Sequence, residues 1–161
     1  MADRAATSCA TNTRVTEACG ASCGVLVDTQ RVVIVMPHPP SSLSPNARVH
    51  WRVRARDAAR VRREAFCLTR QAIWDGGIDS HPWDAAVMDI EWRFSGRQSD
   101  SDNVVTRVKA ARDGIADACL VRDDKYVVIG SITMERVRRS EQAVVLTLTR
   151  LDAENGRQEA E

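Results

Sequence analysis

Carboxylates in one stretch of the chain have the types and spacing that divalent-metal chemistry needs. Asp100 and Asp102 are two residues apart, and Asp123 and Asp124 follow further along. Carboxylate oxygens are hard ligands that suit Mg²⁺ or Mn²⁺. Such an ion would lower the pKa of a bound water and neutralise charge as a phosphodiester is displaced in line. Because clustered carboxylates repel one another without a cation, the stretch favours a metal site.

A lysine and a helix start accompany these acids. The backbone N–H groups of the expected helix start, residues 103–105, would favour an anion, and Lys109 could meet the developing charge on a phosphate. The same residues also have a plain structural interpretation, with Asp102 as an N-cap and Asp100 and Asp123-Asp124 in polar loops. On spacing alone that interpretation is the stronger one, because Asp is common in caps and loops.

Basic residues concentrate upstream of the acids. The segment 46–63 has seven arginines against one acid, Asp57, so in a chain of net charge +1 the remainder carries −5. A basic segment on an acidic body is typical of a protein that contacts a polyanion with one surface. A solvated helix face is the alternative, which the lack of matching acids weakens. The residues expected to contact DNA phosphates are Asn46, Arg48, Arg52, Arg54, Arg56, Arg60, Arg62 and Arg63.

The elements that must position these side chains follow the order β-α-β-α-β-β. Short apolar or alternating runs predict strands, with residues 31–36 covered on both faces and 126–134 and 143–149 forming an antiparallel hairpin. A Pro-rich loop spans residues 37–46. We expect a single α/β domain over residues 31–150, in two or three layers, with a mixed sheet of about four strands and two main helices. The remaining expected elements are a helix over 52–74, a strand over 87–94, a helix over 103–119 and tails over 1–30 and 151–161.

Apolar periodicity predicts which helix faces are buried. The second helix has an apolar residue at each four- or three-residue step, at Val104, Val108, Ala111, Ile115 and Ala118, and Asp102 occupies its expected N-cap. The stripe on the first helix is sparser. Its expected members are Val53, Ala58 or Ala59, Phe66 and Ile73.

The combined pattern resembles the RusA family of Holliday-junction resolvases. The resemblance lies in DSDN over residues 100–103, then Lys109, Asp113 and Asp123-Asp124 before a strand. The run PHPPSSLSPNAR over residues 37–48 is similar to that family's opening, a strand leading into a Pro-rich loop and an Asn/Arg pair. The likeness covers roughly residues 31–150, and the combination is far more specific than the aspartates alone.

This resemblance implies a homodimeric, Mg²⁺-dependent endodeoxyribonuclease that nicks four-way DNA junctions symmetrically, of a type often encoded by phages. Mn²⁺ is expected to substitute for Mg²⁺. Asp100, Asp102 and Asp124 correspond to the family's catalytic, metal-binding aspartates, with Asp123 as a further candidate, and Lys109 to its catalytic lysine. In one form of the motif the lysine stands where this chain has Thr106. Positions 106 and 109 lie four and seven residues after Asp102, so both fall on the same face of the expected helix. Position 109 is about 4.5 Å further along the helix axis.

Bringing Asp124 to the Asp100/Asp102 pair is a geometric problem. A helix over residues 103–119 would hold its ends roughly 25 Å apart. The chain after Cys119 could run back alongside the helix. Alternatively, two helices pack antiparallel across a dimer axis, so that Asp124 of one subunit serves the site of the other. The sequence leaves both routes open.

Other classes of function are less compatible with the composition. No apolar stretch approaches the roughly 18–20 residues of a membrane span. The five cysteines, an odd number, suit a reducing cytoplasm, such as that of a bacterial host if the protein is phage-encoded. A zinc knuckle from Cys9, Cys19 and Cys23 lacks a fourth ligand. The functional alternatives are a non-catalytic DNA-binding module and a nuclease that prefers flaps or forks.

Overall fold

The computed structural model describes residues 25–28, 31–76, 78 and 82–151. The described residues form one α/β domain with two α-helices and a mixed sheet, as the sequence predicts. The sheet has five strands where about four were expected, because an additional strand precedes the predicted β-α-β-α-β-β order. In chain order the elements are β1 (Val25–Asp28), β2 (Arg31–Met36), α1 (Trp51–Gly76), β3 (Ala86–Phe94), α2 (Ser101–Asp117), β4 (Val127–Arg136) and β5 (Ala143–Arg150), with 3₁₀ turns at Ser41–Leu43, Asp124–Tyr126 and Arg139–Glu141.

The sheet is mixed, with the order β1-β2-β5-β3-β4. Strands β3 and β4 are parallel, which requires a long crossover, and α2 supplies it. All other pairs are antiparallel. The predicted hairpin between the last two strands is therefore wrong, because β3 lies between them. Strand β5 takes the central position since its Val144, Leu146 and Leu148 are fully buried, whereas β4 exposes alternate residues at the sheet edge.

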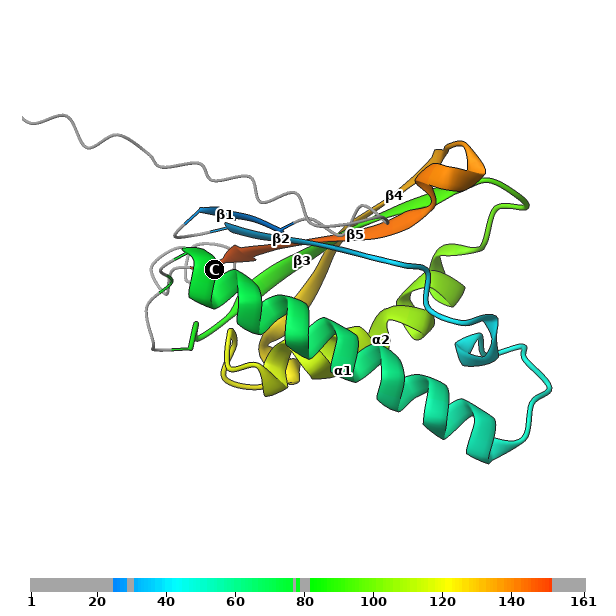
Figure 1. The fold of residues 1–161 in the computed structure, drawn as a ribbon, viewed down its shortest axis with the longest axis horizontal. Helices are drawn as coiled ribbons and strands as arrows, with labels where there is room; N and C mark the ends of the chain where they lie inside the picture. The colour runs from blue at the N-terminus through cyan, green and yellow to red at the C-terminus, as the bar shows by residue number, and fades with distance from the viewer. Residues whose placement is uncertain (1–24, 29–30, 77, 79–81, 152–161) are drawn as a thin grey trace, which may run out of the picture.

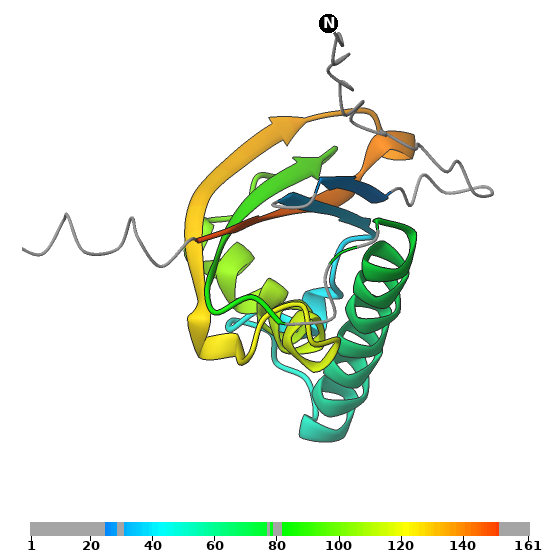
Figure 2. The same ribbon diagram turned by 90° about the vertical axis from the view of Figure 1, so that its left-hand side faces the viewer.

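Both helices cover the same face of the sheet, so the domain has two layers (Figures 1 and 2). The core lies between them. The expectation that residues 31–36 are covered on both faces is wrong: Val32, Ile34 and Met36 are buried, whereas Val33 and Val35 are only half-buried. In β3 the predicted alternation is confirmed, with Met88, Ile90 and Trp92 buried on the helix-covered face.

Helix α1 buries a face of small residues. The buried residues of the helix are Val61, Ala65, Thr69 and Ala72. Of the predicted stripe, Ala58 and Ile73 pack against the core from its edge, whereas the prediction for Phe66 is wrong, because it is 37% exposed. Small side chains let the two helices approach closely. A Cβ atom on Gly114 of α2 would lie 2.1 Å from the Arg62 carbonyl oxygen of α1, so the helices cross backbone to backbone at this glycine.

Helix α2 buries the predicted apolar stripe, and Val104, Val108, Ala111, Ile115 and Ala118 are each at most 1% exposed. The helix begins and ends two residues earlier than expected. It stops because Cys119 adopts a left-handed conformation, φ 62°, which commonly terminates helices. A glycine is the usual residue there, so the sequence carries no obvious stop signal at this point.

The predicted tails lie largely outside the described residues, as do Cys9, Cys19 and Cys23. Strand β1 falls within the segment predicted as an N-terminal tail, so the prediction that this tail extends to residue 30 is wrong. Cys67 and Cys119 are exposed free thiols. Within the described residues, neither helix combines the length and apolar character of a membrane span.

Candidate functional site

The paired aspartates stand at the start of α2, after the loop that follows β3. Asp100 is the N-cap residue, with φ −70° and ψ 150°, and makes no side-chain cap hydrogen bond. The N-cap prediction for Asp102 is therefore wrong, because Asp102 is already helical. Asn103 Nδ2 donates to Asp100 Oδ2 at 3.5 Å. Both carboxylates are exposed to solvent, and among the described residues neither forms an ion pair.

The Pro-rich loop reaches the same end of α2. Ser44 Oγ donates to Asn103 Oδ1 at 3.5 Å, and the Arg107 guanidinium donates to the carbonyl oxygen of Pro39. The two parts of the sequence that carry the family resemblance, the loop and the DSDN run, are thus neighbours in the fold. These two contacts join residues that are far apart in the chain. They therefore fix the position of the Pro-rich loop, which leads into α1.

A stack of side chains holds that loop against the sheet. The His38 ring lies 4.2 Å from the Trp92 ring, centroid to centroid, and the Arg107 guanidinium lies 4.7 Å from the same ring. The His38 Nε2 atom is 2.7 Å from the carbonyl oxygen of Arg93. Burial lowers the pKa of His38 and of Arg107. His38 is not among the predicted site residues, because its partners are too distant in the chain to be recognised from spacing.

A second group of motif residues surrounds a hollow of about 450 Å³ beside the second half of α2. It is open to solvent and lined on one side by Arg62 of α1. The Arg62 guanidinium forms two hydrogen bonds with Asp117, of 2.5 and 2.8 Å, and this contact lowers the pKa of Asp117. The motif residues that line the hollow are Lys109, Asp113, Asp123 and Asp124.

The two consecutive aspartates after α2 each have a basic partner. Arg112 Nη2 lies 3.1 Å from Asp124 Oδ2. Asp123 accepts a hydrogen bond from the backbone N–H of Lys125 at 3.2 Å, which is the largest cause of its lowered pKa. Sequence reasoning missed Arg112. Its position three residues after Lys109 is the only signal that could have placed it at the edge of this group.

An open face of α2 connects the two groups. Asp102, Thr106, Lys109 and Asp113 follow one another at steps of four, three and four residues, so they share one side of the helix. Of these, only Asp113 is half-buried, and the others are exposed. Thr106, which occupies the shorter lysine spacing, donates its hydroxyl to the carbonyl oxygen of Asp102 at 2.9 Å. Lys109 lines the hollow one turn further along.

One protomer does not bring Asp124 to the paired aspartates. Asp124 contacts Arg112, which follows Asp102 by ten residues, a separation of about 15 Å along the helix axis. The chain after Cys119 does run back beside α2, but only as far as Arg112. Within the described residues, no group of three or more His, Cys, Asp or Glu side chains could hold a metal ion. Of the two predicted routes, the return of the chain within one protomer therefore stops short.

The eight residues predicted to contact DNA are all exposed, on the loop before α1 and on α1 itself. Four of the arginines, Arg52, Arg56, Arg60 and Arg63, recur at steps of four, four and three residues and so share one side of α1. The single acid of the segment, Asp57, accepts a 2.5 Å hydrogen bond from Ser42 and lies 3.5 Å from Arg56. The Ser42 hydroxyl is the main cause of its lowered pKa.

Two of the four remaining predicted residues, Arg54 and Arg62, also make contacts within the fold. Arg54 donates to the carbonyl oxygen of Ala47 at 2.9 Å, which closes the loop onto the first turn of α1. Arg62 is engaged by Asp117 across the helix pair. The basic surface therefore divides into a stripe along the outer side of α1 and a few arginines that also support the fold.

Comparisons with known proteins place the chain beside one relative of undetermined function. No family model matches the sequence. Two solved structures each align with a TM-score of 0.33 and 11% sequence identity. One is a proposed translation initiation inhibitor from Salmonella typhimurium, where the alignment covers 86% of this chain and 96% of that chain. The other is the OmpA-like domain of FopA1 from Francisella tularensis, where it covers 81% of this chain and 83% of that chain. At that TM-score neither assigns a fold or a function.

The sequence relative is much closer. An uncharacterized protein of Xylella fastidiosa (strain Temecula1) is 36% identical over 147 residues, which cover 84% of this chain and 89% of the relative. Identity at this level over nearly the full length of both proteins means common descent and a shared fold. The chain therefore belongs to the same protein family as this uncharacterized protein of Xylella fastidiosa.

Proposed function

We propose that the protein is a metal-dependent, structure-selective endodeoxyribonuclease that resolves four-way DNA junctions, as its RusA-like motif implies. The observation that carries the proposal is the open face of α2, where Asp102, Lys109 and Asp113 lie in one row from the helix start to the hollow. Acids at a helix start beside a lysine on the same solvent-facing side can hold a hard cation and a phosphate together.

The exposed pair Asp100 and Asp102 fits the ligand chemistry of Mg²⁺. This ion is usually held by one or two carboxylates, with water and substrate phosphate oxygens completing an octahedron. A cation bound there would neutralise charge on the phosphate and would lower the pKa of a water molecule that it binds. Asn103, which contacts Asp100 at 3.5 Å, would orient that carboxylate. Lys109 would face the phosphate from one side of the same helix.

The third carboxylate would come from a second copy of the chain. If two α2 helices pack antiparallel about a two-fold axis at the level of Arg107, each Asp102 lies opposite the level of Arg112 in the partner, and hence near that chain's Asp124. In the isolated protomer Arg112 neutralises Asp124, so a cation would have to replace the guanidinium there. This dimer would contain two equivalent sites, as symmetric nicking of a junction requires.

The arginines would supply contacts to the DNA backbone. Phosphate contacts position a nucleic acid without reading its bases, which suits a substrate defined by its shape. The stripe of Arg52, Arg56, Arg60 and Arg63 lies on the side of α1 that does not pack against the core. Each such contact should release counterions, so the affinity should fall steeply as the salt concentration rises.

The test is nicking of a synthetic four-way junction in Mg²⁺, with a fork and linear duplex as comparison substrates. We expect the junction to be cut fastest, and Asp102→Asn and Asp100→Asn to lower the rate by about a hundredfold or more while leaving junction affinity intact. Asp75→Asn, an exposed aspartate at the far end of α1, is the matched control and should cut normally. Binding without cleavage, in Mg²⁺ and in Mn²⁺ alike, would refute the nuclease proposal.

A second candidate function, a non-catalytic DNA-binding module, is favoured by one observation. Within a single protomer the described residues contain no cluster of three metal-ligating side chains, while every arginine of the stripe is exposed. Under this alternative Asp100→Asn and Asp102→Asn have no effect on any measured activity. Preferential cutting of the fork over the junction would instead support a nuclease with a different branched substrate.

A further inference from the structure

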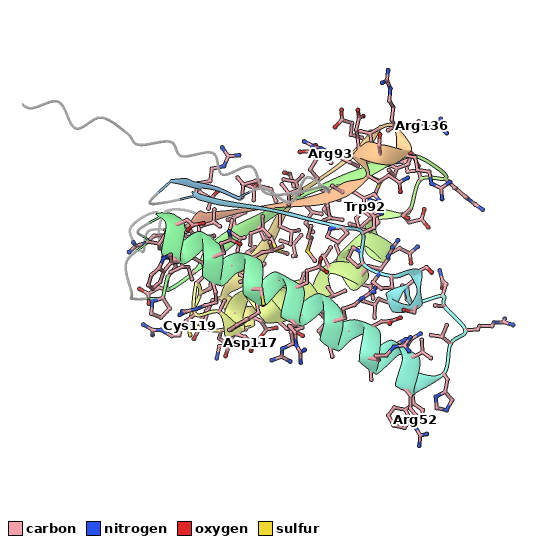
Figure 3. All side chains as sticks on the ribbon, in the orientation of Figure 1. Arg52, Trp92, Arg93, Asp117, Cys119 and Arg136 are labelled. Atoms are coloured by element: carbon pink, nitrogen blue, oxygen red, sulfur yellow. The ribbon has the colours of Figure 1, made fainter. Side chains whose placement is uncertain are left out.

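An exposed aromatic residue occupies the far tip of α1. Trp51 is the first residue of the helix, and its side chain is 67% exposed. The N-terminal end of α1 extends past the sheet and past α2, as the position of Arg52 at the extremity of the helix shows (Figure 3). The two tryptophans of the core, Trp83 and Trp92, are at most 2% exposed. An indole exposed at a projecting tip offers a large apolar face to a partner.

The tip is ordered and positively charged. His50 caps α1, with its Nδ1 atom accepting from the backbone N–H of Arg52 at 3.2 Å, and its ring lies 5.7 Å from the Trp51 ring. The Arg52 guanidinium is 5.4 Å from the same indole. Arg54 ties the first turn to the preceding loop. The aromatic surface is therefore held in place before any partner binds, among cations that suit a polyanion.

The tip lies on the same side of the molecule as the proposed catalytic face. Trp51 and Arg62 are separated by eleven residues, which is within about 20° of three full helical turns. Arg62 lines the hollow that contains Lys109, Asp113 and Asp124. The indole thus projects on the hollow's side of α1, about 16 Å along the axis from Arg62. Roughly five base pairs, at 3.4 Å each, span that distance.

We propose that Trp51 stacks on a base exposed where a DNA duplex is interrupted, at a branch point or an unpaired nucleotide. In a continuous duplex the faces of the bases are covered by their neighbours, so an indole can stack only where that order is broken. The inference rests on the proposed function for the identity of the substrate. It adds the residue that distinguishes branched DNA from linear duplex, a distinction that arginine–phosphate contacts alone do not make.

Binding of a four-way junction and of a linear duplex is measured in EDTA, where no cleavage occurs. Trp51→Ala should weaken junction binding about tenfold, the typical loss of one stacked base. Its duplex affinity should change by less than about twofold, because phosphate contacts remain. Trp51→Phe, which keeps an aromatic face, should retain most of the junction affinity. The control is Trp74→Ala, at the other end of α1 and 86% exposed, which should not change the preference for the junction.

Fluorescence gives an independent readout. In a Trp74→Phe background Trp51 is the one well-exposed tryptophan among the described residues. In the free protein, acrylamide should readily quench the emission of Trp51. When a junction carrying 2-aminopurine at its branch point binds, stacking on that base should itself lower the Trp51 emission. An indole already shielded in the free protein would mean that a second copy covers the tip, and would overturn the proposal. So would equal losses for junction and duplex in Trp51→Ala, or equal effects of Trp51→Ala and Trp74→Ala.

The two proposals can fail separately. If the wild-type protein never nicks a junction but Trp51→Ala loses selective binding, the nuclease proposal fails and the stacking proposal stands. If junctions are nicked but Trp51→Ala binds and cuts them as the wild type does, the stacking proposal alone fails.

Discussion

At the scale of single residues, the group around His38 shows how a loop outside the sheet is fixed in position. The ring packs on buried Trp92 and contacts the carbonyl oxygen of Arg93, and the positively charged Arg107 lies on the same indole. Desolvation by burial, reinforced by the charge of Arg107, lowers the pKa of His38 below its usual value. The folded protein therefore holds this imidazole in its neutral form.

This arrangement predicts a specific pH dependence of stability. The unfolded chain takes up a proton on His38 near pH 6.5, whereas the folded chain does so only at lower pH. As the pH falls through about 6.5 the unfolded state binds more protons, so the free energy of unfolding should decrease between about pH 7 and pH 5. His38→Gln, which can still donate to Arg93, should reduce that slope in denaturant titrations across this range. A slope identical to that of the wild type would contradict the prediction.

At the scale of elements, the crossing of α1 and α2 positions everything in the candidate site. Gly114 lies against the Arg62 backbone, and the Arg62 side chain binds Asp117 on the next turn of α2. The hollow, the open face of α2 and the tip of α1 all take their relative positions from this contact. A change in the spacing between the helices would therefore alter the site without touching any of its acidic residues.

Gly114→Ala should consequently destabilise the fold. The added methyl would overlap the Arg62 carbonyl oxygen and approach the Phe66 backbone nitrogen at 3.1 Å, so the helices must separate, at a cost of about 2–3 kcal/mol. Thermal unfolding should show a lowered midpoint. Gly96→Ala is the matched control, because a Cβ there meets nothing within 4 Å, and it should change stability by less than about 0.5 kcal/mol. Equal midpoints for the two variants would show that the helix contact tolerates expansion.

At the scale of the whole molecule, the open question is whether one chain or two build the proposed metal site. Asp124 contacts Arg112, which lies ten residues, or about 15 Å along the axis of α2, from Asp102. A second copy packed alongside α2, next to its open face, would complete the site and leave that face accessible to DNA. The Asp100/Asp102 pair of one chain and Asp124 of the other would then lie together at one interface.

Mixing of inactive subunits tests this arrangement directly. Asp102→Asn and Asp124→Asn should each abolish nicking alone, yet a mixture in which subunits exchange should recover activity, because half of the sites in a mixed dimer contain every wild-type carboxylate. At random pairing with equal amounts, about a quarter of the wild-type sites should return. A mixture that stays inactive, although subunit exchange is demonstrated by a size-tagged chain, would place each site within one chain.

The sequence by itself determined the elements from β2 onward and the apolar stripe of α2, because a helix that packs one side against a sheet must repeat its apolar residues at three- and four-residue steps. Its assignment of metal-binding carboxylates stays a prediction. It did not determine that β5 would separate β3 from β4, since strand order depends on which strand buries the most apolar surface among all the others. The small-residue face of α1 was missed because Ala and Thr carry little hydrophobic signal, and their value lies in how closely they let a partner helix approach. The tertiary structure alone decided that Lys109, Asp113 and Asp124 share a hollow while Asp100 and Asp102 stand a few turns away. That separation depends on the residue at which α2 ends, beside Cys119, and on the path by which the chain then turns back. Residue spacing in the sequence predicts neither of these.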